Sequence, residues 1–505
     1  MRFRRACGTL VHPTSFPSDY GMGDFGKGAR KFIDFLKTTG QTVWQILPLT
    51  PVGYGDSPYT SYSAFAGNHY LISPDTLEEK GLLTSSELLE ARLPSTTKAQ
   101  FSQAYAHKER LFRLASQRYF EDHSPATRAL FEQFQNSNNY WLEEYTVFMA
   151  SLKVNGWKSW NEWPSGLARR NRRLLEDFKR EHREEIRYQT WLQYEFAAQW
   201  SSLKSYANER DIQIIGDIPI FVNHNSADVW SRPELFEVGS DGKPKLVSGV
   251  PPDYFSETGQ LWGNPLFNWK KMEENGFSWW IERFRQMFRL FDATRIDHFR
   301  GFEAYWEVPA SEKNAINGKW VKGPGEKLFI TIQKELGRLP VIAEDLGVIT
   351  PAVDKLRDRF SFPGMKVLQF AFGSDSGNPY LPHHYPRNCV VYTGTHDNDT
   401  TLGWYHSAPP ADVHRARVYT RSDGSEINWE LIRLAMLSTA DLAIFPMQDF
   451  MNLGQEHRMN IPGTAENNWT WRYTDEMLER TDHGRIRFLS ELSARIPNPK
   501  KQQSD

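Results

Sequence analysis

The stretch Asp292-Ala-Thr-Arg-Ile-Asp-His-Phe-Arg-Gly-Phe-Glu-Ala-Tyr-Trp-Glu307 opens with a short run typical of a strand and then brings acids, arginines and a histidine together. Because alternate side chains of a strand share a face, Arg295 and Asp297 should point the same way. A guanidinium beside a carboxylate favours its ionised form, which a nucleophile requires. A buried structural ion pair at the end of a strand explains the same two residues, so this stretch alone leaves both interpretations open.

Aromatic residues follow this polar group closely, at Phe299, Phe302, Tyr305 and Trp306. The whole chain is rich in them, with 18 Trp, 20 Tyr and 32 Phe. Such side chains fill large cores, and they also provide the flat apolar faces on which sugar rings stack. The composition is therefore compatible with a carbohydrate site without requiring one.

Length and charge narrow the class of protein. The 505 residues carry a net charge of -2, which gives no reason to expect nucleic acid or an anionic membrane as a partner. Arg2, Arg4 and Arg5 resemble the charged start of a signal peptide, but no long apolar run follows them, and none elsewhere is long enough to span a bilayer. The two cysteines, Cys7 and Cys389, form no disulfide framework and no metal-binding spacing, so we expect a cytoplasmic protein.

Eight apolar runs have the length and composition of buried strands, with helical patterns between most of them. They lie at residues 7–11, 42–49, 211–218, 293–297, 340–345, 366–370, 389–393 and 442–446. This alternation predicts an α/β fold, a (β/α)₈ TIM barrel, over the single unit 1–505. We expect a mainly helical subdomain inserted at about 51–210, with helices at 100–120, 139–152 and 170–208. A second insertion at about 221–275, largely the long loop 221–268, is expected to lie over the cleft.

The polar clusters of the chain fall at the carboxyl ends of these predicted strands, where barrel enzymes place their active sites. The clusters are Asp217, Arg295 with Asp297, Glu344 with Asp345, and His396 with Asp397. A barrel would bring all of them to one rim although they are far apart in the sequence. This expected convergence favours a catalytic role over isolated structural ion pairs.

Three carboxylates beside an aromatic cleft suit the chemistry of glycosidic bonds. Asp297, flanked by Arg295, suits an ionised nucleophile. Glu344 suits the acid/base, since we expect the neighbouring charge of Asp345 to raise the pKa of Glu344. Asp397, beside His396, could hold sugar hydroxyls as positive charge develops on the sugar.

Other interpretations of these residues remain open. The sequence Asp397-Asn-Asp399 begins like a calcium loop, but Leu402 stands where that loop needs glycine. The two histidines and two aspartates at 297–298 and 396–397 could form a hydrolytic metal site, although no His-x-x-x-His pair supports it. Trp279 and Trp280 are expected in the core, whereas Tyr54, Tyr59 and Trp262 lie in glycine-rich loops and are expected to contact ligand.

Ten motifs resemble the 4-α-glucanotransferases, also called amylomaltases or disproportionating enzymes, which form glycoside hydrolase family seventy-seven of the α-amylase clan. The motifs are 53–59 (GYGDSPY), 63–68 (SAFAGN), 216–222 (GDIPIFV), 250–259 (VPPDYFSETG), 262–265 (WGNP), 295–301 (RIDHFRG), 343–347 (AEDLG), 393–399 (TGTHDND), 458–463 (RMNIPG) and 468–472 (NWTWR). The resemblance covers nearly the whole chain.

The resemblance implies a role for each matching residue. It implies that Asp297 is the nucleophile, Glu344 the acid/base and Asp397 the transition-state stabiliser, as the chemistry suggested. It implies that Arg295, His298 and His396 contact the donor sugar, and that Tyr59, Asp253, Trp262 and Asn460 reach the cleft from loops. Together with Tyr54 and Asp217, these are the substrate-binding residues that we expect.

The family resemblance also implies an activity and its partners. It implies a retaining enzyme that transfers α-1,4-glucan segments to the 4-hydroxyl of another glucan or of glucose. It implies no metal, no cofactor and no separate C-terminal β-domain. A monomer or small homo-oligomer is expected. A hydrolase of the same fold and a non-catalytic starch- or glycogen-binding barrel are the alternatives, the second disfavoured because binding alone needs no nucleophile.

Overall fold

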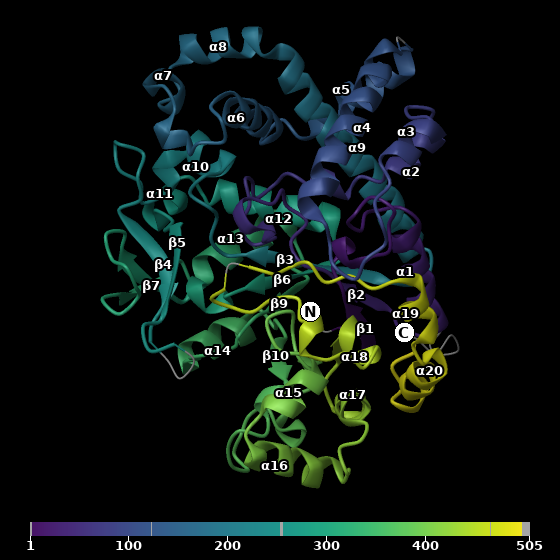
Figure 1. Ribbon diagram of the computed structural model, residues 1–505. Helices are drawn as coiled ribbons and strands as arrows, with labels where there is room; N and C mark the ends of the chain where they lie inside the picture. Colours follow the sequence, from purple (N-terminus) through teal and green to yellow (C-terminus); the bar gives the residue numbers. More distant parts are fainter. Residues whose placement is uncertain (1–2, 123, 253–255, 465, 497–505) are drawn as a thin grey trace.

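The computed structural model describes residues 3–122, 124–252, 256–464 and 466–496, and its centre is one parallel sheet (Figure 1). Eight strands follow one another in the order β10-β11-β12-β1-β2-β3-β6-β9. The strands are β1 (Ala6–Leu10), β2 (Val43–Gln45), β3 (Gln213–Pro219), β6 (Ala293–Asp297), β9 (Val341–Ala343), β10 (Gly364–Val367), β11 (Cys389–Tyr392) and β12 (Leu442–Pro446). The Ala343 N–H donates to the Pro363 carbonyl at 2.9 Å, so the two outer strands meet and the barrel is nearly closed. The predicted (β/α)₈ barrel and its eight strands are confirmed.

The barrel strands are apolar because helices cover their outer faces while side chains fill the interior. Every residue of β1, β11 and β12 is buried. Gly8 allows β1 and β2 to approach closely, since a Cβ there would lie 2.1 Å from the Val43 carbonyl oxygen. Continuous burial on both faces is what made these short runs recognisable in the sequence.

Helices surround the barrel at the positions that the helical patterns predicted (Figure 1). They include α1 (Lys27–Thr38), α12 (Ser278–Leu290), α13 (Glu326–Leu336), α14 (Pro351–Arg359) and α17 (Ile427–Leu437). After β12, the named elements of the described residues are all helical: α18 (Met447–Phe450), a short 3₁₀ turn, α19 (Asp475–Arg480) and α20 (His483–Leu492). Trp279 and Trp280 are fully buried on α12, as expected of core residues.

The segment between β2 and β3 is mainly helical and lies at the top of Figure 1. Its helices are α2 (Pro74–Glu79), α3 (Ser85–Glu90), α4 (Phe101–Glu121), α5 (Pro125–Ser137), α6 (Leu142–Val154), α7 (Ser165–Ala168), α8 (Arg172–Glu181) and α9 (Arg183–Asn208). The predicted helix 170–208 is interrupted at His182, whose ψ of 24° is not helical. The limits of this insertion as a subdomain stay a prediction.

A small antiparallel sheet was not predicted. It has the order β5-β4-β7-β8 and consists of β4 (Leu246–Val250), β5 (Gln260–Pro265), β7 (Ala304–Pro309) and β8 (Lys319–Lys322). The expectation of a long loop over 221–268 is therefore wrong for β4 and β5, and for the helix α10 (Ala227–Ser231). The sequence of β5, Gln-Leu-Trp-Gly-Asn-Pro, has turn-forming residues, and only Pro265 of the strand is buried. β5 forms a strand because its backbone pairs with β4, a tertiary contact that the hydropathy pattern does not reveal.

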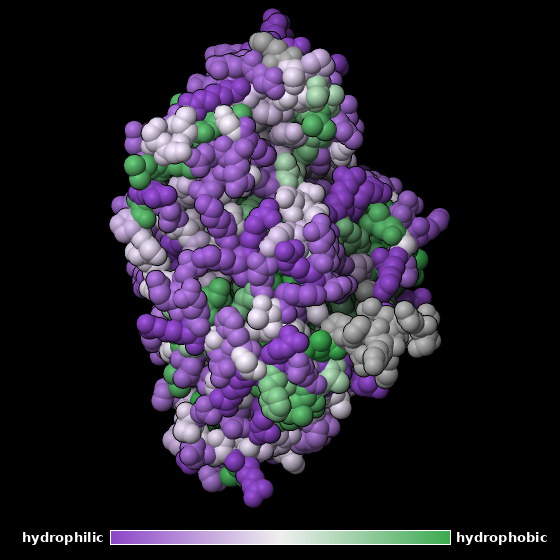
Figure 2. Space-filling model, turned by 90° about the vertical axis from the view of Figure 1, so that its right-hand side faces the viewer, coloured by the Kyte–Doolittle hydropathy of each residue, from purple (hydrophilic) through white to green (hydrophobic). Residues whose placement is uncertain are grey.

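The surface shown in Figure 2 is mostly hydrophilic, with apolar residues in scattered small groups. In the described part of the chain, no helix combines the length and the apolarity that crossing a membrane requires. Cys7 and Cys389 are buried free thiols.

Candidate active site

Arg295 links two carboxylates at the ends of β3 and β6. The register of these strands places Asp217 beside Arg295 and Pro219 beside Asp297. Nη1 of Arg295 donates to Oδ2 of Asp217 at 2.6 Å, and Nη2 donates to Oδ1 of Asp297 at 2.7 Å. The Asp217 side chain is 0% exposed, whereas that of Asp297 is 32% exposed. The shared face of Arg295 and Asp297 is confirmed, and only Asp297 of the two carboxylates faces the open rim.

Tyr59 reaches this pair from the glycine-rich loop after β2. Its hydroxyl donates to Oδ2 of Asp217 at 2.7 Å, and its ring stacks on His396 with centroids 5.2 Å apart. Burial, and then the charge of Asp217, raise the pKa of Tyr59, so this phenol is a neutral donor. Burial also raises the pKa of Asp217, but Arg295 opposes that rise. We take Asp217 as ionised, because the guanidinium and the phenol both donate to one of its oxygens.

Glu344 directly follows β9 and is held by two backbone amides. Its carboxylate accepts from the N–H of His298 at 2.7 Å and from the N–H of Leu346 at 2.8 Å. His298 adopts a left-handed conformation, with φ of 53°, just after Asp297. Burial and then the charge of Asp297 raise the pKa of Glu344 to about 8. This rise in pKa favours the protonated form of Glu344 near neutral pH.

The predicted reason for the raised pKa of Glu344 is wrong. Asp345 accepts from the Arg357 guanidinium and from the Met365 N–H, so it lies at the junction of β9 and β10. Successive residues at the end of a strand point to opposite sides, which separates Glu344 from Asp345. The like charge that acts on Glu344 is Asp297, and the larger effect is burial.

Asp397 lies in the loop after β11, where its side chain is 47% exposed. Nδ2 of Asn460 donates to Oδ1 of Asp397 at 2.6 Å. Nε2 of His396 lies 3.4 Å from Oδ2 of Asp397. Burial lowers the pKa of His396 despite the nearby carboxylate, so it contacts Asp397 as a neutral imidazole. The structure thus brings the predicted residues Asp397, His396 and Asn460 together.

Trp262 covers His298 from β5, with ring centroids 4.8 Å apart and planes at 87°. Trp262 is 37% exposed, so part of its ring remains available to a ligand. Burial lowers the pKa of His298 to about 4. Among the described residues, Nε2 of His298 has no hydrogen-bond partner, and neither has Oδ1 of Asp217. Unpaired buried polar atoms are uncommon in folded proteins and are consistent with a ligand site.

The contacts described above do not include two of the predicted binding residues, Asp253 and Tyr54. Asp253 lies outside the described residues. Tyr54 begins a 3₁₀ turn (Tyr54–Asp56) in the loop that carries Tyr59, and its contact with ligand stays a prediction. Trp469, in contrast, belongs to a family motif but was not predicted to line the site. Its ring centroid lies 5.7 Å from that of Tyr59 and 6.0 Å from that of His396.

The metal interpretations gain no support from the described residues, among which no cluster of three or more His, Cys, Asp or Glu side chains is arranged to hold an ion. In the segment read as a calcium loop, Oδ1 of Asp399 accepts from the Thr400 N–H at 2.8 Å. Thr400 in turn caps α15 (Thr401–Ser407). This carboxylate is thus engaged by the protein itself.

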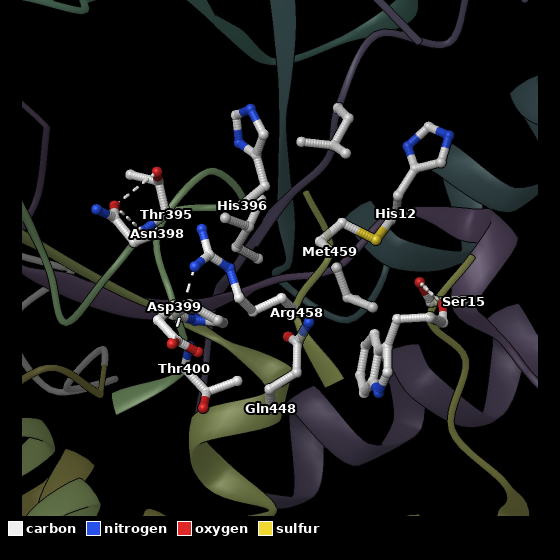
Figure 3. A pocket seen from close by; sticks show the side chains of 15 residues that line it. His12, Ser15, Thr395, His396, Asn398, Asp399, Thr400, Gln448, Arg458 and Met459 are labelled. Atoms are coloured by element: carbon white, nitrogen blue, oxygen red, sulfur yellow. Dashed lines mark hydrogen bonds and ion pairs between the residues drawn. The ribbon is translucent and has the colours of Figure 1, made fainter. Parts of the chain in front are cut away.

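A small cavity lies beside His396 and is lined in part by Thr395, Asn398 and Asp399 of the same loop (Figure 3). Its volume of about 20 Å³ leaves room for about one water molecule. Polar side chains on its wall include His12, Asp399, Gln448 and Arg458. Burial lowers the pKa of His12 to about 3, so Arg458 is the cation of this group.

The residues at the rim of the barrel, taken together, indicate the class of protein. Charges from four separate strand ends act on one another. Asp217, Asp297 and Asp397 all raise the pKa of Tyr59, and Glu344 raises the pKa of Arg295. A parallel barrel with converging acids at the carboxyl ends of its strands has the architecture of a barrel enzyme.

Comparison with known proteins identifies the family within this class. A sequence model described as 4-alpha-glucanotransferase matches residues 11–478. The chain is 48% identical over 504 residues to the 4-alpha-glucanotransferase of Thermus thermophilus, covering 98% of this chain and 100% of that one. It is 47% identical to the enzyme of Synechocystis, covering 97% and 98%. The chain belongs to the 4-alpha-glucanotransferase family, as its motifs indicated, and its activity is that of a 4-alpha-glucanotransferase.

The solved structures agree with the fold and the family. The amylomaltase from Streptococcus agalactiae, determined in complex with acarbose, superposes with a TM-score of 0.95 at 36% identity. The alignment covers 98% of this chain and 100% of that one. An amylomaltase from Corynebacterium glutamicum superposes with a TM-score of 0.79 at 18% identity, covering 96% and 75%, and supports the fold alone.

Proposed function

We propose that this chain transfers α-1,4-glucan segments by a retaining mechanism, through a covalent glycosyl-aspartate on Asp297. The observation that carries the proposal is the contrast between two neighbouring acids. Both side chains are half-buried, but Asp297 is paired with Arg295, whereas desolvation and the charge of Asp297 raise the pKa of Glu344. Asp297 is thus suited to attack the sugar and Glu344 to donate a proton, which are the two carboxylate roles in retaining enzymes.

In the first half-reaction, a carboxylate oxygen of Asp297 attacks the anomeric carbon of the donor. The glycosidic carbon–oxygen bond breaks, and the proton of Glu344 passes to the departing 4-oxygen. The released glucan then leaves from the acceptor side. Asp397, held by Asn460, is placed to strengthen its hydrogen bonds with the distorted sugar as positive charge develops.

In the second half-reaction, the 4-hydroxyl of an acceptor gives its proton to Glu344 and attacks the same carbon. The ester to Asp297 breaks, and the carboxylate returns. The geometry favours this reversal of roles. The charge of Asp297 raises the pKa of Glu344 in the free enzyme. Formation of the ester removes that charge and lowers this pKa, so Glu344 stays ionised and can accept the proton of the acceptor.

The proposed substrate contacts surround these two acids. We propose that Arg295, Asp217, His298 and His396 hold the donor sugar, and that Tyr59, Trp262 and Asn460 reach it from loops. Asp253 joins them by the family resemblance, and Tyr54 by its place in the same glycine-rich loop as Tyr59. The acarbose complex of the Streptococcus agalactiae amylomaltase supports a glucan-like ligand for this family. The proposed donors are maltooligosaccharides and amylose, with glucose or a glucan as acceptor.

We also propose a cytoplasmic location, because the two cysteines are buried free thiols. A monomer or small homo-oligomer stays a prediction, which light scattering checks.

Incubation with maltotriose tests the proposed function. A transferase produces a ladder of shorter and longer sugars. Glucose and maltose alone would indicate a hydrolase, and an unchanged substrate would indicate a binding protein. Either of these two results contradicts the proposal.

A further inference from the structure

Arg458 joins the two loops that carry Asp397 and Asn460. Its Nη2 donates to the backbone carbonyl of Asp397 at 3.0 Å, and its Nε donates to the carbonyl of Asn460 at 3.3 Å. Its Nη1 lies 3.8 Å from Oδ2 of Asp399, the ion pair drawn in Figure 3. One planar guanidinium therefore contacts both segments that meet at the Asp397 carboxylate.

Asp399 gives this guanidinium a fixed anchor. Its carboxylate accepts from the Thr400 N–H, at the start of α15, and its backbone carbonyl accepts from Nε2 of Gln369 at 2.8 Å. Gly403 of the first turn of α15 lies directly against it, since a Cβ there would be 2.2 Å from Oδ1 of Asp399. The Asp399 side chain is 10% exposed and that of Arg458 is 17% exposed, so water screens their attraction only weakly.

We propose that Arg458 is a positioning residue, which fixes Asp397 and Asn460 relative to each other through their backbone carbonyls. The inference rests on the proposed role of Asp397 as the stabiliser of the transition state. Asp397 itself is half exposed and is held directly by Asn460 and His396. The loop of Asn460 has to be placed before that amide can reach Asp397. Arg458 holds the loop in this position from the side that is largely shielded from solvent.

The requirement is for a guanidinium and not merely for a positive charge. The contacts of Arg458 use three nitrogens that point in different directions from one rigid plane. A lysine presents its donors from a single atom on a flexible stem, so it can satisfy Asp399 but not both carbonyls. Arg458→Lys should therefore behave more like Arg458→Met than like the parent protein.

The first experiment compares Arg458→Met and Arg458→Lys with a matched control, Arg415→Met. Arg415 likewise donates to a backbone carbonyl, that of Phe372 at 2.6 Å, and to Asp412 at 2.7 Å, but on the outer helix α16 (Pro410–Thr420). Misplacement of a catalytic group can cost on the order of 10²-fold in rate. We expect kcat of the Arg458 variants to fall by about this factor, with a much smaller change in KM, and kcat of the control to stay unchanged. A normal kcat in both Arg458 variants would overturn the inference, as would an equal loss in the control.

Chemical rescue separates positioning from general stability. The small cavity beside Arg458 would grow in Arg458→Ala and leave space for a free guanidinium ion (Figure 3). We expect millimolar guanidinium chloride to restore part of kcat, and equal sodium chloride to restore none. Recovery of kcat that is identical in both salts, or absent in both, would contradict the proposed geometry.

A double-mutant cycle distinguishes failure of this inference from failure of the proposed function. If Arg458 acts through Asp397, Arg458→Met should cause little further loss in an Asp397→Asn background, measured with an activated glycosyl fluoride. Additive losses would mean that Arg458 acts elsewhere. A fully active Asp397→Asn single variant would instead remove the proposed role of Asp397 itself.

Discussion

Glu344 accepts a hydrogen bond from the backbone N–H of His298 at 2.7 Å, and His298 is the residue that follows Asp297. The left-handed turn at His298 therefore ties the proposed acid to the strand that carries the proposed nucleophile. Left-handed backbone is costly for a residue other than glycine and is found disproportionately at functional sites. This hydrogen bond holds the Glu344 carboxylate against the backbone next to Asp297 and thereby limits the spacing of the two acids.

The nucleophile assignment predicts the effect of Asp297→Asn. The amide keeps the shape of the side chain but cannot form the covalent intermediate. We expect kcat to fall by roughly 10⁴-fold or more, while the melting temperature and the affinity for maltooligosaccharides change little. Turnover on maltotriose, calorimetric unfolding and binding calorimetry are the measurements. Near-normal turnover by a folded variant would remove the assignment.

The acid assignment predicts a dependence on the leaving group. Glu344→Gln should lose most activity on maltooligosaccharides, because their sugar leaving group needs a proton. A glycosyl fluoride needs less acid assistance, so the variant should retain partial activity in the first step with this donor. The ratio of fluoride release to maltotriose turnover is the quantity to compare with the parent protein. An unchanged ratio would mean that Glu344 does not act as the acid.

The raised pKa of Glu344 predicts the alkaline limit of activity. The carboxyl must be protonated to act as the acid, so kcat/KM should fall as the pH rises through about 8. The charge of Asp297 contributes to this pKa, so Asp297→Asn should shift the titration of Glu344 to lower pH, as followed by infrared spectroscopy of the carboxyl. A kcat/KM that stays level well above pH 8 would disagree with the environment of Glu344.

Preference for sugar over water requires an acceptor site, because water is always concentrated around the intermediate. We expect the loops 54–63 and 249–262 to hold the incoming 4-hydroxyl and to cover the glycosyl-enzyme, which can be worth several kcal/mol of barrier. Trp262→Ala should therefore raise the ratio of new reducing ends to transferred glucosyl units, and Tyr54→Ala and Tyr59→Ala should do the same. If the ratio stays constant while overall activity falls, these loops bind only the donor.

The barrel and its rim were accessible from the sequence because burial on both faces makes strands such as β11 and β12 uninterrupted apolar runs. The first polar side chain after such a run, as at Glu344, then lies at the rim. The antiparallel sheet was not accessible, since only one residue of β5 is buried and its pairing with β4 is not encoded in a hydropathy period.

The direction of side chains at the strand ends was the other feature that could not be predicted from the sequence. Glu344 and Asp345 are adjacent acids with opposite surroundings, and only the structure shows which of them faces Asp297. Trp469 and Arg458 come from a polar segment after the last strand, within motifs that were noticed without a role for these residues. Their function depends on contacts with the loop 395–399, which composition does not reveal.

The most direct test of the central claim is to identify the residue that carries the glycosyl group. Glu344→Gln treated with α-maltosyl fluoride should accumulate the intermediate, because its formation needs little acid and its transfer needs the base. We expect the intact mass to increase by one maltosyl unit and the adduct to map to the peptide containing Asp297. An adduct on another acid such as Asp397, or turnover of the fluoride with inverted anomeric configuration and no adduct, would contradict the account.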